Sequence, residues 1–372
     1  MGQNSTVKNF SFITLGRVAA IGLQAVFYLI FAALLEPESY GILNYIVAIA
    51  GTFALVSRFG LNYTIIVYQA KKNLTLSDQV NTLVAITSSI AGLILIPINV
   101  FAALLSVASS FFIMNQSNLA GLQQYKAQML NALLKNATLL IIPFLLYFIL
   151  EIPGIVLGMA ICNFIGSIHF FRNLKIKPFL NLLNNYKVLI HNFGVDASYN
   201  LPRMVDKLVI VPLLGFFVVG IYQFNMQILF ALEILPVALH FFLLSEESKG
   251  ERHKKLSYLV ILGSIALAIT AMLLSPFFVM TFFPNYSEGI PSLQILVFTI
   301  IPLSMSSIFS AKLQASESTK IGYSALVRIG ILLTLIALLG EAFGLVGLSI
   351  AVLISVIINT IFLAILYLKT KN

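Results

Sequence analysis

The stretch Pro202-Arg203-Met204-Val205-Asp206-Lys207 lies inside residues 192–239, which are otherwise apolar enough for two membrane-spanning helices. Charges at membrane depth are costly unless they face a partner or a water-filled cavity. On a helix, Asp206 and Lys207 lie three and four positions after Arg203, so the three side chains share one face. The proline that opens the stretch removes a backbone donor and is expected to kink the helix. The segment therefore predicts a polar stripe buried in a membrane-embedded helical bundle.

The composition indicates a polytopic membrane protein. Hydrophobic residues make up 59% and charged residues 9% of the 372 residues, and the mean hydropathy is +1.00. So few charges cannot cover the surface of a soluble protein of this length. The net charge of +9 does not indicate nucleic-acid binding, because the lysines and arginines concentrate in short connections. A single cysteine, Cys162, excludes an internal disulfide framework and a cysteine-based zinc cluster.

About twelve apolar runs are long enough to span a bilayer, which takes about 17–25 residues each. The fourth run is weakened by Asn115, Gln116, Ser117 and Asn118. The expected spans are residues 10–35, 40–69, 78–97, 100–123, 126–150, 153–172, 187–214, 217–244, 255–283, 289–313, 320–340 and 344–369.

The connections between these runs alternate in charge. One set is rich in lysine and arginine, as at Lys71 with Lys72 and across residues 172–187. The other set carries glutamates, as at Glu36 with Glu38, and no lysine or arginine. The positive-inside rule then predicts a multi-pass protein of the cell membrane with both termini in the cytoplasm.

The longest basic connection, residues 172–187, divides the chain near its midpoint. We expect two six-helix lobes, residues 1–180 and 181–372, since Asn9-Phe10 and Asn192-Phe193 open equivalent runs. Tyr40-Gly41-Ile42 and Gly220-Ile221-Tyr222 follow in the two halves. Six spans per half predict a parallel repeat about an axis normal to the membrane. The expected fold class is an all-α integral membrane protein with two pseudo-symmetric lobes around a central cavity.

Catalytic signatures are missing from the sequence. The connections are too short for a soluble catalytic domain, and there is no G-x-x-x-x-G-K-[ST] phosphate loop. No Ser/His/Asp set, cysteine nucleophile or His/Glu metal cluster appears among the spans. We therefore expect a protein that is not an enzyme and needs no cofactor.

Several stretches resemble polysaccharide and O-antigen export flippases of the Wzx type, in the multidrug/oligosaccharidyl-lipid/polysaccharide exporter superfamily. The resemblance implies alternating access and a polyprenyl-diphosphate-linked oligosaccharide as cargo, moved from the cytoplasmic to the outer leaflet for surface glycan assembly. The stretches that carry it are residues 36–45, Arg58-Phe59-Gly60-Leu61-Asn62, Val205-Asp206-Lys207-Leu208-Val209-Ile210, Leu214-Gly215, Val219-Gly220-Ile221-Tyr222, residues 234–239 and Phe283-Pro284-Asn285-Tyr286.

Basic residues within the spans are the candidate contacts for such a cargo. The planar guanidinium binds phosphate oxygens in bidentate fashion, and an ammonium adds a point charge. The alternatives are arginine stems that only reach the headgroups, and buried ion pairs that only fix helix packing. The candidates are Arg17, Arg58, Arg203, Lys207 and Arg328.

Three acidic residues are candidates for coupling transport to a proton or sodium ion. Asp196 precedes the charged stretch, Asp206 lies within it, and Glu233 lies in the eighth run. Each would act by changing its charge as the cavity fills and empties. The alternative for each is a hydrogen bond or ion pair that serves packing alone.

Two other functions stay open from the sequence. A multidrug antiporter of the same superfamily usually carries cations, which predicts more acids than bases in the cavity. Here the five basic candidates outnumber the three acidic ones. A membrane-embedded polysaccharide polymerase or glycosyltransferase usually has a long external loop, whereas the external connections here are short.

Overall fold

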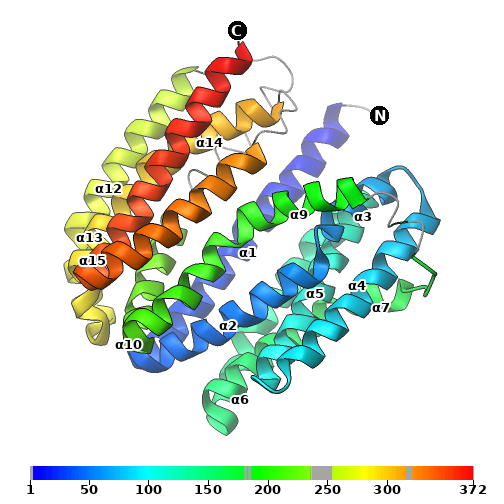
Figure 1. Cartoon of the computed structure of the whole chain (residues 1–372), viewed down its shortest axis with the longest axis horizontal. Helices are drawn as coiled ribbons and strands as arrows, with labels where there is room; N and C mark the ends of the chain where they lie inside the picture. The colour runs from blue at the N-terminus through cyan, green and yellow to red at the C-terminus, as the bar shows by residue number, and fades with distance from the viewer. Residues whose placement is uncertain are drawn as a thin grey trace. The chain divides into compact units, whose positions relative to one another are not determined.

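The computed structural model describes residues 3–179, 182, 186–234, 236, 254–315 and 321–371. Within these residues the chain is helical and contains no strand (Figure 1). Its elements are α1 (Gln3–Leu34), α2 (Pro37–Arg58), α3 (Leu61–Ala70), α4 (Leu74–Leu95), α5 (Val100–Gly121), α6 (Tyr125–Gly166), α7 (Ile168–Asn173), α9 (Tyr186–Asn200), α10 (Pro202–Leu232), α12 (Lys254–Phe282), η1 (Pro284–Gly289), α13 (Ile290–Leu296), η2 (Val297–Thr299), α14 (Ile300–Ala315) and α15 (Ile321–Lys371).

Eight candidate membrane spans lie in the described part of the chain, judged by helix length and apolar composition. They include α4 and α5, although the polar run at residues 115–118 falls within α5. Helices α6 and α15 have 42 and 51 residues, more than the roughly 20 that cross a bilayer once. Each contains a non-helical residue, Glu151 or Gly344. The all-helical membrane fold is confirmed, and the count of about twelve spans stays a prediction.

The reversals in α6 and α15 are structurally equivalent. Glu151 has φ 54° and ψ −134°, and Gly344 has φ 56° and ψ −134°. Three residues later, a Cβ added to Gly154 would overlap the Leu146 carbonyl, and one added to Gly347 would overlap the Leu339 carbonyl. Both helices therefore fold back into hairpins with backbones in close contact. The two reversals lie at or next to the connections that the sequence predicts between the fifth and sixth and between the eleventh and twelfth spans.

A second pair of equivalent positions meets where α2 and α10 cross. A Cβ added to Gly41 would overlap the Phe216 carbonyl, and one added to Gly220 would overlap the Pro37 carbonyl. Each glycine thus approaches the residue four positions before the other. This reciprocity is the mark of a local two-fold relation, as expected for the motifs around Gly41 and Gly220.

Two of the interruptions in the expected spans lie next to charged residues. The run at 40–69 consists of α2 and α3, because Phe59 and Gly60 have positive φ angles of 45° and 72°. The run at 187–214 is divided between α9, which ends at Asn200, and α10, which begins at Pro202. The second interruption is the one expected at Pro202, where a ring and a missing N–H favour the start of a helix.

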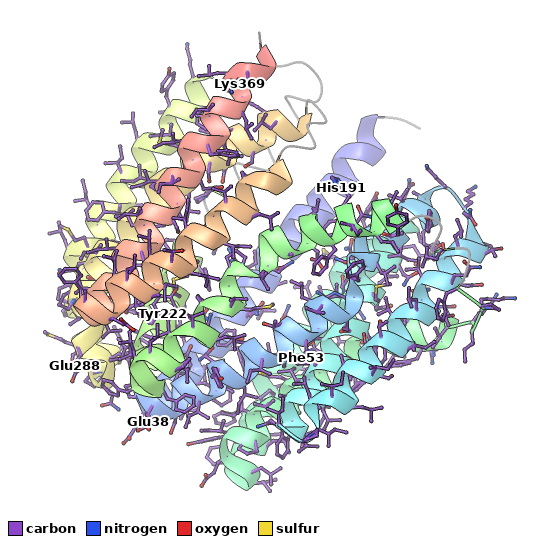
Figure 2. The ribbon with its side chains drawn as sticks, viewed as in Figure 1. Glu38, Phe53, His191, Tyr222, Glu288 and Lys369 are labelled. Carbon is purple, nitrogen blue, oxygen red and sulfur yellow. The ribbon has the colours of Figure 1, made fainter. Side chains whose placement is uncertain are left out.

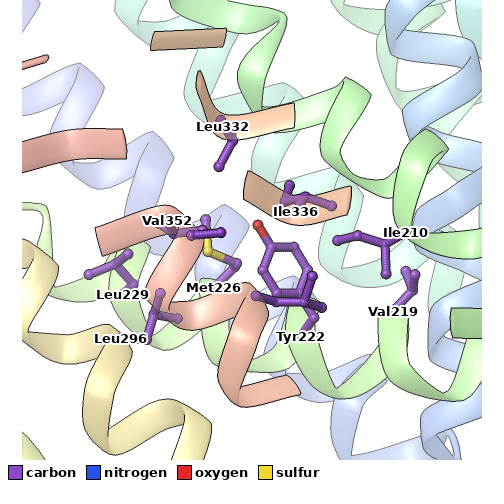
Figure 3. Packing of buried hydrophobic residues seen from close by; sticks show 11 residues of the cluster. Ile210, Val219, Tyr222, Met226, Leu229, Leu296, Leu332, Ile336 and Val352 are labelled. Carbon is purple, nitrogen blue, oxygen red and sulfur yellow. The ribbon is translucent and has the colours of Figure 1, made fainter. Parts of the chain in front are cut away.

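The chain forms two compact units. The first comprises Met1–Phe27 and Tyr45–Val205, and its apolar core includes Leu61, Val84 and Phe111. The second comprises Tyr28–Asn44 and Asp206–Asn372, and its core surrounds Tyr222 (Figure 3). The expected pseudo-symmetric lobes, residues 1–180 and 181–372, stay a prediction.

Candidate functional site

The break between α2 and α3 packs against α9 in the first unit. The Phe59 and Phe193 rings stack with centroids 4.8 Å apart. A Cβ added to Gly60 would overlap the Phe193 backbone, so this contact requires glycine as well as a positive φ. One turn further along α9 lies Asp196, and one residue before the break lies Arg58. The break therefore positions Arg58 beside Asp196.

Arg58 and Asp196 form a buried ion pair with few hydrogen bonds. Arg58 Nη2 lies 3.5 Å from Asp196 Oδ2, and each side chain is 2% exposed. In the part of the chain that the structure describes, Arg58 Nε and Nη1 have no hydrogen-bond partner. Asn200 Nδ2 donates to Asp196 Oδ1 at 2.8 Å. A buried guanidinium with two unpartnered nitrogens has donors available for an anion.

The end of α2 is held by hydroxyl groups from neighbouring helices. Ser57 Oγ lies 3.2 Å from Ser88 Oγ and 3.1 Å from Ser110 Oγ. Thr87 Oγ1 donates to the Ser57 carbonyl at 2.7 Å. These bonds fix the backbone just before Arg58, so its guanidinium extends from a rigid helix end.

A second buried pair, Asp206 and Lys207, lies on α10 in the second unit. Lys207 donates to Asp206 Oδ1 from its backbone N at 2.8 Å and from Nζ at 3.1 Å. The Tyr222 hydroxyl donates to Asp206 Oδ2 at 3.0 Å. Figure 2 labels Tyr222 further along the same helix. Both carboxylate oxygens of Asp206 therefore accept hydrogen bonds, from Lys207 and from Tyr222.

The expected polar stripe is not one continuous buried face. Asp196 pairs with α2, Asp206 pairs with its own neighbour, and Arg203 is exposed. Among the described side chains, the buried charged residues are two bases and two acids, so their charges balance. Expected site residues elsewhere are Arg328 on α15 and Glu233 just after α10, both half-buried. The Arg17 side chain lies outside the described residues.

A group of buried and half-buried carboxamides was not identified from the sequence as a candidate site. Gln69 Nε2 donates to Asn118 Oδ1 at 3.0 Å, and Asn118 Nδ2 donates to Asn81 Oδ1 at 2.9 Å. These residues join α3, α5 and α4 in the first unit. The signal was the polar run at residues 115–118, whose only expected effect was to weaken the fourth span. Helix α5 still packs as a membrane helix because Asn118 of this run is satisfied by hydrogen bonds to Gln69 and Asn81.

Sequence comparisons place the chain among membrane proteins. Residues 6–142 match a protein family described as "Polysaccharide biosynthesis protein". The chain is 27% identical over 395 residues to an uncharacterized membrane protein of Methanocaldococcus jannaschii, and the match covers 94% of this chain and 95% of that protein.

Solved structures of two kinds of transporter share the fold. Lipid II flippase MurJ in an inward closed conformation matches with a TM-score of 0.78 and 15% identity, over 97% of this chain and 87% of that chain. An inward-facing multidrug resistance MATE family transporter of the MOP superfamily matches with a TM-score of 0.71 and 16% identity, over 95% and 94%. The fold expected from the resemblance is thus shared with a solved lipid II flippase and a multidrug resistance transporter, and the family match is in line with the resemblance to polysaccharide-export proteins.

Proposed function

We propose that this chain is a transporter that moves a polyprenyl-diphosphate-linked oligosaccharide from the cytoplasmic to the outer leaflet of the cell membrane. The polysaccharide biosynthesis family match supports a cargo used in glycan assembly. The fold shared with a lipid II flippase supports a lipid-linked cargo. Both supports concern relatives, so the chemical argument depends on this chain's own residues.

The observation that carries the proposal is the incompletely bonded Arg58. Burying a charge without hydrogen bonds costs free energy, and a pair at 3.5 Å recovers little of it. Such an arrangement is stabilised when an anion occupies the remaining donors. A diphosphate suits these donors because a guanidinium binds phosphate oxygens with charge-assisted hydrogen bonds.

The remaining predicted residues take secondary roles in this proposal. Arg17, Arg203 and Arg328 are proposed as further cations that meet the diphosphate along its path. Lys207 is proposed as structural, because Asp206 already accepts from its ammonium. For a coupling proton or sodium ion, Asp196 and Glu233 are the proposed candidates. Asp206 is less available, since both of its oxygens accept hydrogen bonds.

The transport cycle follows alternating access. With the protein open to the cytoplasm, Arg58 captures the diphosphate while the polyprenyl tail stays in lipid. Rearrangement of the two halves of the chain then exposes the diphosphate to the outside. The cargo shifts this equilibrium only through its different affinities for the two states, so uphill transport needs an ion gradient or the membrane potential.

Reconstitution into liposomes tests the proposal. A fluorescent polyprenyl-diphosphate oligosaccharide is incorporated, and its appearance in the opposite leaflet is followed by quenching. Wild type should accelerate this movement, Arg58→Gln should slow it strongly, and Arg172→Gln, a change at an exposed arginine of α7, should behave as wild type. Movement of a cationic dye without movement of the lipid would support a multidrug antiporter instead. Glycosyl transfer by the purified chain would contradict the proposal altogether.

A further inference from the structure

We infer that Asp196 is an internal competitor for Arg58, occupying the guanidinium nitrogen that a bound phosphate needs and thereby weakening the affinity for cargo. This inference rests on the proposed function, because it assigns a role to the residue that faces the proposed phosphate site. It makes Asp196 a determinant of cargo affinity and release.

The shape of the guanidinium carries the argument. It offers two edges for bidentate ligands: Nε with Nη2, and Nη1 with Nη2. The Asp196 carboxylate lies against Nη2, the nitrogen that both edges share. The two nitrogens without partners, Nε and Nη1, lie on different edges. Nη2 has one N–H on each edge, so a bidentate phosphate on the edge that Asp196 faces has to displace the carboxylate, and a phosphate on the other edge meets its negative charge across the same nitrogen.

The Arg58–Asp196 contact is also weak enough to be displaced. At 3.5 Å it exceeds the usual length of about 2.7–2.9 Å for a charge-assisted hydrogen bond. Asp196 Oδ2 accepts no hydrogen bond within the described residues. Asp196 Oδ1, in contrast, accepts from Asn200 at 2.8 Å, so the carboxylate keeps one partner after it leaves Arg58.

A competitor and a purely structural partner predict opposite effects on binding. If Asp196 only orders Arg58, its loss leaves the guanidinium badly placed, and phosphate affinity falls. If Asp196 competes, its neutralisation removes both the occupied nitrogen and the like charge beside an incoming phosphate. Affinity then rises and dissociation slows, because tighter binding within one site acts mainly on the off-rate.

A double-mutant cycle distinguishes the two roles. The full chain in lipid nanodiscs is titrated with farnesyl diphosphate, and with farnesol as the control for the tail. We expect Asp196→Asn to bind the diphosphate about tenfold more tightly than wild type, the size of effect from removing about 1.4 kcal/mol of competition. Arg58→Gln should bind weakly, and Arg58→Gln with Asp196→Asn should show no gain. Asp78→Asn, which removes an acid from α4 of the same unit, should leave the affinity unchanged.

Each outcome decides the inference. Equal or weaker binding by folded Asp196→Asn, or a gain that persists without Arg58, would overturn it. If Asp196→Asn does not fold, Asp196→Glu keeps the charge on a longer stem, and unchanged or weaker binding is expected; a gain would contradict competition. Absence of diphosphate binding in wild type and Asp196→Asn alike would contradict both the inference and the proposed function. Arg58-dependent binding in wild type without the Asp196→Asn gain would overturn the inference alone.

Discussion

The two buried ion pairs differ in how completely their hydrogen bonds are made. Arg58 and Asp196 come from α2 and α9, lie 3.5 Å apart and leave two guanidinium nitrogens unpartnered in the described structure. Asp206 and Lys207 are neighbours on α10, and their carboxylate accepts three hydrogen bonds. A pair whose hydrogen-bonding groups are all occupied has few donors left for a ligand. A pair with unoccupied donors can bind a ligand, but those unsatisfied buried groups lower the free energy of unfolding. The difference separates a candidate binding group from a structural one.

The largest expected effect comes from removing the base of each pair. Arg58→Gln should lower the rate of lipid movement by about 100-fold, the equivalent of losing charge-assisted hydrogen bonds worth about 3 kcal/mol. Lys207→Gln should leave movement per folded molecule within about twofold while lowering stability by about 3–5 kcal/mol, because a buried carboxylate loses its partner. The liposome assay, normalised to monodisperse protein, measures both. Equal loss in the two variants would remove the functional distinction between the pairs.

The next effect tests the backbone that brings the first pair together. Gly60→Ala places a side chain where φ is 72° and where the Phe193 backbone already lies. Left-handed strain and overpacking should cost about 2–4 kcal/mol in free energy of unfolding and weaken diphosphate binding. Gly263→Ala is the matched control, since nothing lies within 4 Å of its added Cβ. Denaturant titration in bicelles measures both variants, and similar stability for the two would contradict this account of the break.

A smaller effect sharpens the description of the second pair. Tyr222→Phe removes the donor to Asp206 Oδ2 from a fully buried position. The loss of a hydrogen bond to a charged acceptor should lower the free energy of unfolding by about 2 kcal/mol. Lipid movement by the folded protein should stay at the wild-type rate. A large loss of movement with unchanged stability would assign this pair to the transport path.

The smallest effect concerns the hydrogen bond that supports Asp196. Asn200→Ala removes the donor to Asp196 Oδ1, a bond of 2.8 Å at a half-buried position. The expected loss of stability is about 1 kcal/mol, typical of one net hydrogen bond. Without this partner the carboxylate should hold Arg58 more firmly, so diphosphate affinity should fall slightly. The same nanodisc titration checks this, and a clear rise in affinity would contradict the role given to Asn200.

The helical membrane fold was predictable because it depends on local composition. Apolar runs of sufficient length have to become helices in a bilayer, where each backbone group needs a partner within the segment. The interruption at Pro202 follows equally from the chemistry of one residue. The break at Phe59 and Gly60 does not, since residues 40–69 are apolar enough on average for one continuous span in spite of Arg58. Only packing against α9 reveals why the backbone adopts positive φ there.

The site was predictable in residue type but not in pairing. The buried charges among the described side chains are all candidates predicted from the sequence: Arg58, Asp196, Asp206 and Lys207. Helical spacing placed Arg203, Asp206 and Lys207 on one face, yet Arg203 is exposed whereas Asp206 and Lys207 are buried and pair with each other. Asp196 pairs with a residue far away in the chain. Tertiary contacts decide such pairings, and no local spacing contains them.

The most direct test of the central claim is a structure of the full chain bound to farnesyl diphosphate. We predict a phosphate oxygen within about 2.7–3.2 Å of Arg58 Nη2, with the Asp196 carboxylate displaced from that nitrogen and the Asp206–Lys207 pair unchanged. A structure with Asp196 still against Nη2 and the diphosphate bound away from Arg58 would contradict the account.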